Sequence, residues 1–177
     1  MTKDEEKLFD VDIFNDAGEP IGAKPWPQVD RRRDVLRNAF VYVFTPEREM
    51  LLATITEEHL SKKIYKGKLG SPAVTLVRHG ESCEKAATRA LVNDLAIYSS
   101  KLVHLGDTFE TFNDGTKRHM CVFFCVHDAN VKPNGHMLAN VRRVRRQDME
   151  TLLRLNPEQF SPQFVQSYQR YKRHFPF

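Results

Sequence analysis

Hydrophobic residues along this chain follow two different periods. In several short segments they occupy every second position, which is typical of strands, and in others they recur every third or fourth position, which is typical of helices. Strands are predicted over residues 8–14, 19–23, 37–44, 50–56, 101–112, 119–127 and 138–144. Helices are predicted within residues 80–97, over residues 145–155 and after Ser161. The predicted order is two strands, a loop, two strands, a helix, three strands and two helices.

The segment from Gly80 to Ile97 has the clearest helical pattern. Gly80 tolerates unusual backbone dihedrals, and the good helix formers that follow it are not interrupted by Gly or Pro. Four apolar residues at intervals of four share one face, namely Cys83, Ala87, Leu91 and Leu95. The pattern predicts a loop, one helix and a return to extended chain.

Turn and cap signals mark the ends of several other elements. Asn15-Asp16-Ala17-Gly18 predicts the turn of an opening hairpin. Asn113-Asp114-Gly115 predicts a second hairpin turn, because Asp-Gly suits the positive φ angles of such turns. Residues 119–127 form the most apolar run and predict a fully buried strand. Ser161-Pro162 predicts the N-cap and first turn of the last helix.

Length and composition predict a single soluble domain over residues 1–177. The chain is 41% hydrophobic and 28% charged, which is ordinary for a globular protein. Residues 1–7 are highly charged and are expected to form a flexible tail; they lack the apolar core of a signal peptide. No segment approaches the roughly 18 apolar residues that a membrane helix needs. We therefore expect a cytoplasmic protein with no membrane partner; the sequence carries no signal for its oligomeric state.

The three cysteines do not predict a disulfide framework or a metal site. Cys83, Cys121 and Cys125 are odd in number and fall within predicted helix or strand, which fits a reducing compartment. Cys121 and Cys125 have no second pair of ligands, so zinc is not expected. Cys83 lies on the apolar face of its helix and is expected to be a small buried hydrophobe.

The charge balance is mildly basic, at net +4 with a pI near 9.0, and permits an anionic partner without requiring one. Part of the excess lies in two runs, Arg31–Arg33 and Arg142–Arg146. The second run is either a solvated edge that leads into a helix or a patch that binds phosphate, since guanidinium groups match phosphate geometry. A partner for these runs would be RNA or an acidic protein.

The Gly80–Ile97 segment resembles a Nudix box, the loop–helix–loop signature with which Nudix hydrolases hold Mg²⁺ and a diphosphate. Glu81 matches the first glutamate of that signature, Arg89 its arginine, and Leu91 and Ile97 its aliphatic positions. The Gly-Glu-Ser and Ala-Ala-x-Arg pieces are similar to the branch that includes isopentenyl-diphosphate isomerase. With the order of elements, the resemblance implies an α/β Nudix-type α/β/α sandwich with a mixed sheet, an N-terminal β-hairpin extension and two C-terminal helices.

The sequence departs from the box mainly where the family carries acidic residues. The departures are Thr75 for the first Gly, Ala90 for the Glu after Arg, Asn93 and Asp94 for the Glu pair, and Ala96 for the late Gly. Mg²⁺ requires hard oxygen ligands, and charge on these ligands governs affinity. The resemblance therefore implies that Mg²⁺ binding is weak or absent, with Glu81 and Asp94 as the remaining acidic ligands.

Two box residues are candidates for catalysis. Glu81 is the best-retained position; as an alternative, it is a carboxylate favoured in the first helical turn by the helix dipole. Arg89 is expected to pair with Glu81 or Glu84, which in the family orients the box carboxylates. Asp94 is either a metal ligand or an ordinary exposed helix residue.

Three arginines are candidates for substrate binding. Arg37 occupies the position of an early His or Arg in the strand that feeds the family's substrate cleft, and Arg142 and Arg145 belong to the second basic run. Isomerases of the related branch carry a Cys before the box, where this chain has Val74, so isomerisation is not expected.

These features favour a divergent Nudix-superfamily protein that has lost most of its box metal ligands. It would bind a phosphorylated or nucleotide-like ligand, or a protein partner, with little or no hydrolysis. The alternative is an active Mg²⁺-dependent Nudix hydrolase that cleaves a nucleoside diphosphate linked to another moiety. A third hypothesis is a basic module that binds RNA or acidic proteins.

Overall fold

The structure is a computed structural model that describes residues 9–56, 66–112, 115–128, 130–135 and 138–177. The strands are β1 (Asp10–Phe14), β2 (Pro20–Pro25), β3 (Leu36–Phe44), β4 (Met50–Ile55), β5 (Leu69–Gly70), β6 (Ala73–Leu76), β7 (Val103–Thr111), β8 (Lys117–Val126) and β9 (Leu138–Val144). The α-helices are α1 (Cys83–Leu95), α2 (Arg146–Leu155) and α3 (Pro162–Tyr171). None of the described helices is long and apolar enough to cross a membrane.

The main sheet is mixed and is organised around β3. This strand pairs in parallel with β8 along its whole length, from Leu36 opposite Arg118 to Phe44 opposite Val126. On its other side β3 pairs with β6 and, at one end, with β4. β7 extends the sheet beyond β8, and β4 carries β5 and β9. The density of β-branched and aromatic residues in β3 suits this central position, where both faces are covered.

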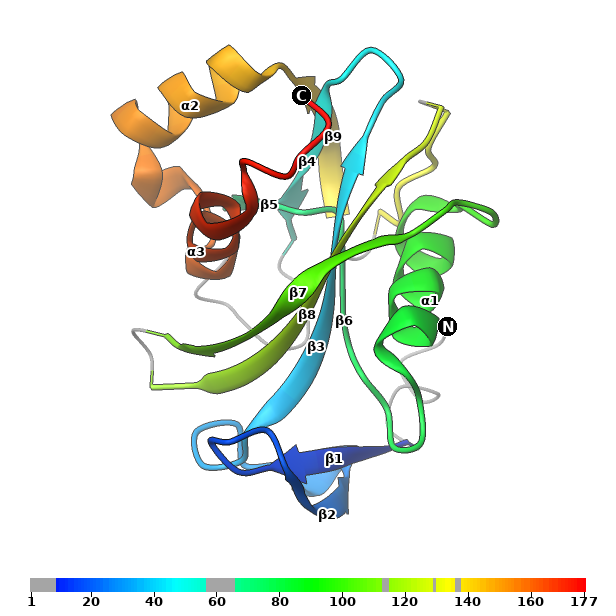
Figure 1. The fold of residues 1–177 in the computed structure, drawn as a ribbon, viewed down its shortest axis with the longest axis vertical. Coiled ribbons are helices and arrows are strands. Elements are labelled where there is room, and N and C mark those ends of the chain that lie inside the picture. The colour runs from blue at the N-terminus through cyan, green and yellow to red at the C-terminus, as the bar shows by residue number, and fades with distance from the viewer. Residues whose placement is uncertain (1–8, 57–65, 113–114, 129, 136–137) are drawn as a thin grey trace.

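The two faces of the sheet are covered by different helices (Figure 1). Alternate residues of β3 and β8 point to opposite faces. Ala39, Val41 and Val43 of β3 pack in the cluster that contains the buried face of α1. Phe40, Tyr42 and Phe44 pack in the cluster formed with α2, α3 and the C-terminal residues. The predicted sandwich of a mixed sheet between helices is confirmed, including its two C-terminal helices.

The N-terminal strands form a separate two-stranded hairpin, as predicted, at one end of the main sheet (Figure 1). Val11 and Ile13 are buried with Leu36, the first residue of β3. Phe14 lies opposite Val35 in an isolated bridge. The hairpin therefore closes the edge of the core where β3 begins.

Several expectations need correction or fall outside the described residues. The short strands β5 and β6 were not predicted, because Ser71-Pro72 interrupts them and leaves too few residues for a clear period. The second arginine run is divided between the predicted strand and the predicted helix, because β9 ends at Val144 and α2 begins at Arg146. The predicted tail over residues 1–7 and the turn at Asn113-Asp114 lie outside the described residues.

The prediction of no disulfide is wrong for one pair of cysteines. Cys83 and Cys121 form a disulfide, with their Cα atoms 6.2 Å apart. Cys125 is a free, buried thiol. Because the two bonded residues are 38 positions apart, on α1 and β8, the sequence alone gave no indication that they meet.

Candidate functional site: the α1 loop and its arginine brace

The loop that leads into α1 has the local chemistry of a helix start. Gly80 adopts a φ of 72°, in the left-handed region that glycine enters without strain. The side chain of Ser82 accepts a hydrogen bond from the backbone N–H of Lys85, which makes Ser82 the N-cap of α1. At the other end, Ala96 takes a φ of 56° and its N–H bonds back to the last turn. Ala96 thus adopts the left-handed conformation at the position where the family pattern has Gly.

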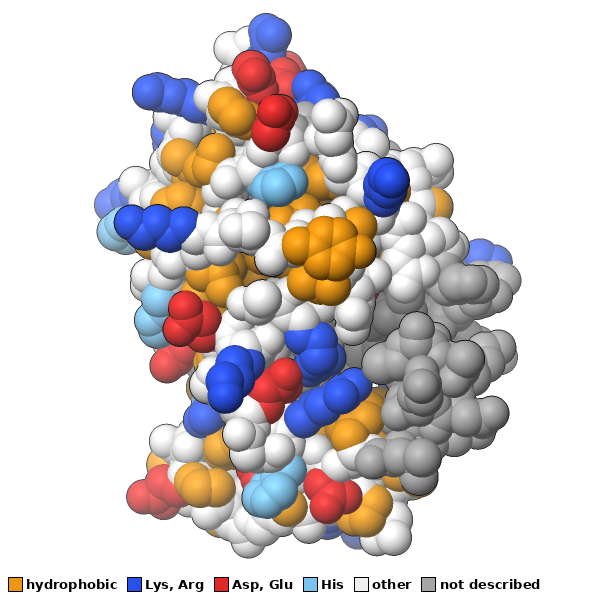
Figure 2. All heavy atoms as spheres, turned by 90° about the vertical axis from the view of Figure 1, so that its right-hand side faces the viewer, with side chains coloured by type: hydrophobic (Ala, Val, Ile, Leu, Met, Phe, Trp, Pro, Cys, Tyr) orange, Lys and Arg blue, Asp and Glu red, His pale blue; other side chains and the backbone are white. Residues whose placement is uncertain are grey.

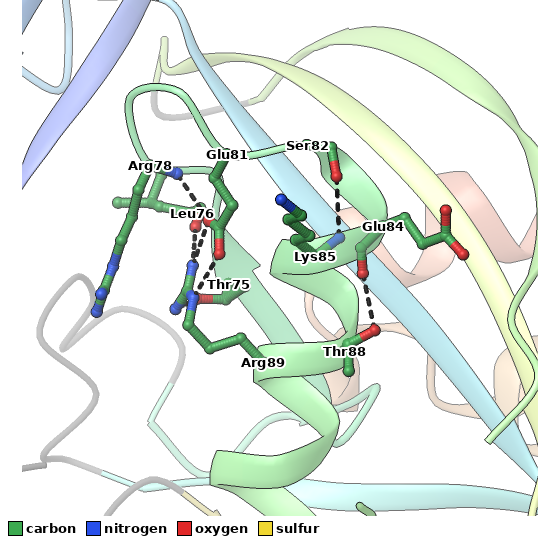
Figure 3. Close-up of polar contacts among 9 residues, drawn as sticks. All are labelled: Thr75, Leu76, Arg78, Glu81, Ser82, Glu84, Lys85, Thr88 and Arg89. Carbon is green, nitrogen blue, oxygen red and sulfur yellow. Dashed lines mark hydrogen bonds and ion pairs between the residues drawn. The ribbon is translucent and has the colours of Figure 1, made fainter. Parts of the chain in front are cut away.

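A carboxylate–guanidinium pair holds this loop against the helix (Figure 3). Arg89 Nε donates to Glu81 Oε1 and Arg89 Nη2 donates to Glu81 Oε2, each at 2.9 Å. Both side chains are largely buried, with exposed fractions of 20% for Arg89 and 15% for Glu81. The predicted pairing of Arg89 with Glu81 is therefore present, in the bidentate geometry that makes such pairs strong.

The same guanidinium also binds strand β6. Arg89 Nη2 donates to the carbonyl oxygen of Leu76 at 2.7 Å, and Arg89 Nη1 donates to Thr75 Oγ1 at 3.1 Å. Arg89 thus ties together the loop, the middle of α1 and the adjacent strand, and we call this set of contacts the arginine brace. Thr75 stands where the family pattern has Gly, and its hydroxyl is a member of the brace that the sequence did not indicate.

The brace fixes the protonation state of Glu81. Partial burial raises the pKa of the Glu81 carboxyl, but hydrogen bonds from Arg89 and from the backbone N–H of Arg78, at 3.0 Å, outweigh this and hold the pKa below its ordinary value. Glu81 is therefore ionised at neutral pH. Its oxygens are committed to donors from the protein, which reduces their availability as metal ligands.

The loop is also attached to the N-terminal hairpin. The backbone N–H of His79 donates to the carbonyl of Asp10 at 2.8 Å, and His79 Nδ1 lies 2.6 Å from Asp12 Oδ1. The guanidinium of Arg78 lies 4.6 Å from the centre of the Phe9 ring, a cation–π contact. Nothing in the sequence pattern indicated that His79 would contact β1.

The positions that the box resemblance assigns to metal ligands do not form an acidic cluster. Ala90 is 1% exposed and packs in the core between α1 and the sheet. Asn93 is exposed and neutral, and Asp94 is partly buried. Within the described part of the chain, no group of three or more His, Cys, Asp or Glu side chains could hold a metal ion. This donor set does not fit a Mg²⁺ site built from several carboxylates.

The two predicted metal ligands, Glu81 and Asp94, come from opposite ends of α1. Glu81 precedes α1, whereas Asp94 lies in its last turn. A rise of 1.5 Å per residue separates the backbone of Asp94 from the start of the helix by about 16 Å. Coordination of one Mg²⁺ by both side chains stays a prediction.

The three arginines expected to bind substrate lie at opposite ends of the molecule. The Arg37 guanidinium lies 4.2 Å from the centre of the Phe14 ring, and its Nη2 donates to the Gly18 carbonyl at 3.4 Å, so it contacts the hairpin. Arg142 is exposed on β9, and Arg145, 71% exposed, lies 3.4 Å from Glu49. The hairpin and the junction of β9 with α2 are far apart along the long axis (Figure 1). The structure does not bring Arg37 together with Arg142 and Arg145.

The surface over α1 carries side chains of both charges and is not dominated by either sign. Figure 2 shows this face, where Lys and Arg side chains are interspersed with Asp and Glu and with hydrophobic side chains. An anionic ligand here would be recognised through a few local contacts rather than through long-range attraction.

Comparisons of sequence find no relatives: no protein-family model and no curated protein matches the chain. Solved structures do match. DR0079 from Deinococcus radiodurans aligns with a TM-score of 0.68 at 16% identity, over 83% of this chain and 90% of that one. The MutT protein from Methanosarcina mazei aligns with a TM-score of 0.62 at 17% identity, over 79% and 94%. The Nudix domain of Shewanella oneidensis NrtR, in complex with ADP ribose, aligns with a TM-score of 0.62 at 13% identity, over 84% and 94%. The architecture and these structural matches together show that the chain has the Nudix fold.

Proposed function

We propose that this protein binds a nucleotide-like ligand that contains a diphosphate, and that it hydrolyses this ligand slowly or not at all. The observation that carries the proposal is the contrast between two parts of one helix. The arginine brace at Glu81 and Arg89 is complete, whereas the box positions for metal ligands carry Ala90, Asn93 and Asp94. The contacts that hold the loop are therefore present, whereas these positions carry less negative charge than the ligands of a divalent metal ion need.

The burial of Ala90 strengthens this argument. A carboxylate at a position that is 1% exposed within an apolar cluster would carry a large desolvation cost. The substitution is therefore part of the packing between α1 and the sheet. It also means that this helix lies against the sheet in a way that leaves no space for an acidic ligand at that position.

Retention of ligand binding is supported by the proteins that share the fold. The NrtR domain was solved in complex with ADP ribose, and an Ap4A hydrolase from Caenorhabditis elegans, solved as a binary complex, aligns with a TM-score of 0.50 at 13% identity. ADP ribose joins adenosine to a ribose through a diphosphate, and Ap4A, for which the second protein is named, joins two adenosines through a chain of four phosphates. We extend this chemical class, but no individual ligand, to the present chain.

The proposal is tested by measuring binding and turnover with the same ligands. ADP ribose, Ap4A and inorganic pyrophosphate would be titrated calorimetrically into the protein, and product release would be followed with Mg²⁺ and with Mn²⁺. We expect saturable binding of at least one nucleotide and no turnover above that of buffer. Metal-dependent turnover that Asp94→Asn abolishes, and that Glu84→Gln on the exposed side of the same helix leaves intact, would instead establish an active hydrolase. Absence of binding to every ligand would refute the binding role.

A further inference from the structure

The disulfide between Cys83 and Cys121 is placed at the start of the helix that carries the brace. Cys83 is the first residue of α1, directly after the N-cap Ser82 and two positions after Glu81. Cys121 lies in the middle of β8 and is 3% exposed. The bond therefore connects the first turn of α1 to the interior of the sheet.

The disulfide and the brace attach α1 to different strands. Arg89 binds Thr75 and Leu76 of β6, whereas Cys83 is bonded to β8. β6 and β8 lie on opposite sides of β3. The first half of the helix is thus held across three adjacent strands, by an ionic contact on one side and a covalent one on the other.

The rest of the helix interface does not depend on this bond. Ala86, Ala87, Ala90, Leu91 and Leu95 bury the remaining turns of α1 against the sheet. A reduced Cys121 thiol would remain a small apolar group in the same cluster. The fold can therefore accommodate both oxidation states, with the difference confined to the first turn.

The two sulfur atoms differ in their exposure to solvent, which determines which of them a thiol in solution can attack. Cys83 is only partly buried, at the start of a helix, whereas Cys121 is almost fully enclosed. Cys125 is buried on the same face of β8, two residue pairs farther along the strand, and is not bonded. Reagents in solution thus reach the pair through Cys83.

We propose that Cys83 and Cys121 form a site of reversible thiol–disulfide exchange that controls the attachment of the first turn of α1. A small-molecule thiolate attacks Cys83 Sγ, the protein S–S bond breaks, and the Cys121 sulfur leaves and takes up a proton. A second small-molecule thiol then resolves the mixed disulfide. The protein gains two thiols, and the two small-molecule thiols are oxidised to one disulfide. Re-oxidation is the reverse reaction, with that low-molecular-weight disulfide as the oxidant.

Thiol counting tests whether the pair forms and exchanges. Native protein would be equilibrated with glutathione buffers of different ratios, acid-quenched, denatured, alkylated and weighed by mass spectrometry. We expect one alkylated cysteine in oxidised glutathione and three in reduced glutathione, with a reversible transition between them. Three alkylated cysteines under every condition would show that the pair does not form. One alkylated cysteine under every condition would show a permanent structural bond; either result overturns the proposal.

Hydrogen exchange tests the consequence for the helix. We expect the amides of Lys85 and Ala86, which bond to Ser82, to exchange at least several-fold faster in the reduced protein, with little change in β3. Cys83→Ala should abolish this redox dependence. Cys125→Ala should retain it, because Cys125 is not bonded. Equal exchange in both redox states of the wild type would refute control of the helix. Neither readout requires a bound nucleotide, so failure here is distinct from failure of the proposed ligand-binding role.

Discussion

Arg89 places two of its nitrogens 2.9 Å from the two carboxylate oxygens of Glu81, across the loop that opens α1. The pair is largely buried, and Arg89 also donates to the Leu76 carbonyl and to the Thr75 hydroxyl. A buried pair of this kind is stable because each charge has its partner and its hydrogen bonds. Its evident role here is to hold the loop, the helix and β6 in one arrangement.

Removal of the arginine should destabilise the protein strongly. Arg89→Ala leaves the Glu81 carboxylate partly buried without its main partner, and we expect a loss of about 3 kcal/mol in the free energy of unfolding. Chemical denaturation measures this loss. Lys85→Ala, one turn earlier on the same helix but exposed, is the matched control and should change stability by less than about 0.5 kcal/mol. Similar effects of the two substitutions would contradict the brace.

Glu81 should make stability depend on acidic pH. Its pKa in the folded protein lies below its ordinary value, so the unfolded chain binds more protons near that value, which is about 4.3. The stabilisation from Glu81 is thus complete above this pH and is lost as the pH falls through the lower folded pKa. The difference in the free energy of unfolding between wild type and Glu81→Gln should shrink as the pH falls through the folded pKa of Glu81. A constant difference between them across acidic pH would refute the assignment.

The contribution of His79 to stability should change with pH in the direction opposite to that of Glu81. The hydrogen bond to Asp12 and the charge of Asp12 raise the pKa of the His79 imidazole above its ordinary value. The stabilising contact is therefore fully present below about pH 6.5 and is lost as the pH rises through the higher folded pKa. An NMR titration of the imidazole should show the raised pKa. Asp12→Asn should return the pKa toward the ordinary value of an imidazole, about 6.5; an unchanged pKa would show that Asp12 does not set it.

The glutamate that the Nudix box carries at the position of Ala90 cannot be introduced without destabilising the fold. Ala90→Glu would place a carboxylate in the core under α1, and we expect it to lower stability by several kcal/mol. Asn93→Glu, on the exposed surface of the same helix, should be tolerated within about 0.5 kcal/mol. Thermal or chemical unfolding of the two variants provides the comparison. A stable Ala90→Glu protein would mean that this position faces solvent, contrary to the packing described.

Sequence patterns predicted most of the elements because their signals are local. The strand predicted over residues 138–144 has the same bounds as β9, and Ser161 caps α3 as its sequence position indicated. β5 and β6 were missed because two or four residues are too short to display a period. The assignment to the isomerase-like branch stays a prediction.

The contacts within the site were harder to predict because they depend on tertiary structure. The Glu81–Arg89 pair follows from a known signature. The contact of Arg89 with Thr75 on β6 and the contact of His79 with Asp12 on the hairpin do not, because each joins segments that are distant in the sequence. Nothing in the spacing of Cys83 and Cys121 indicated that α1 brings them together. The three arginines predicted to bind substrate come from two distant segments of the sequence, and the fold keeps Arg37 apart from Arg142 and Arg145.

We propose that the fold keeps the contacts that support a Nudix box but lacks a competent site for a divalent cation. Direct titration of Mn²⁺, followed by its electron paramagnetic resonance signal, tests this claim without reference to any substrate. We predict that Mn²⁺ binds no more tightly than in the millimolar range and that Asp94→Asn does not alter the titration. Micromolar binding that Asp94→Asn removes would contradict the account and would establish a metal site on α1.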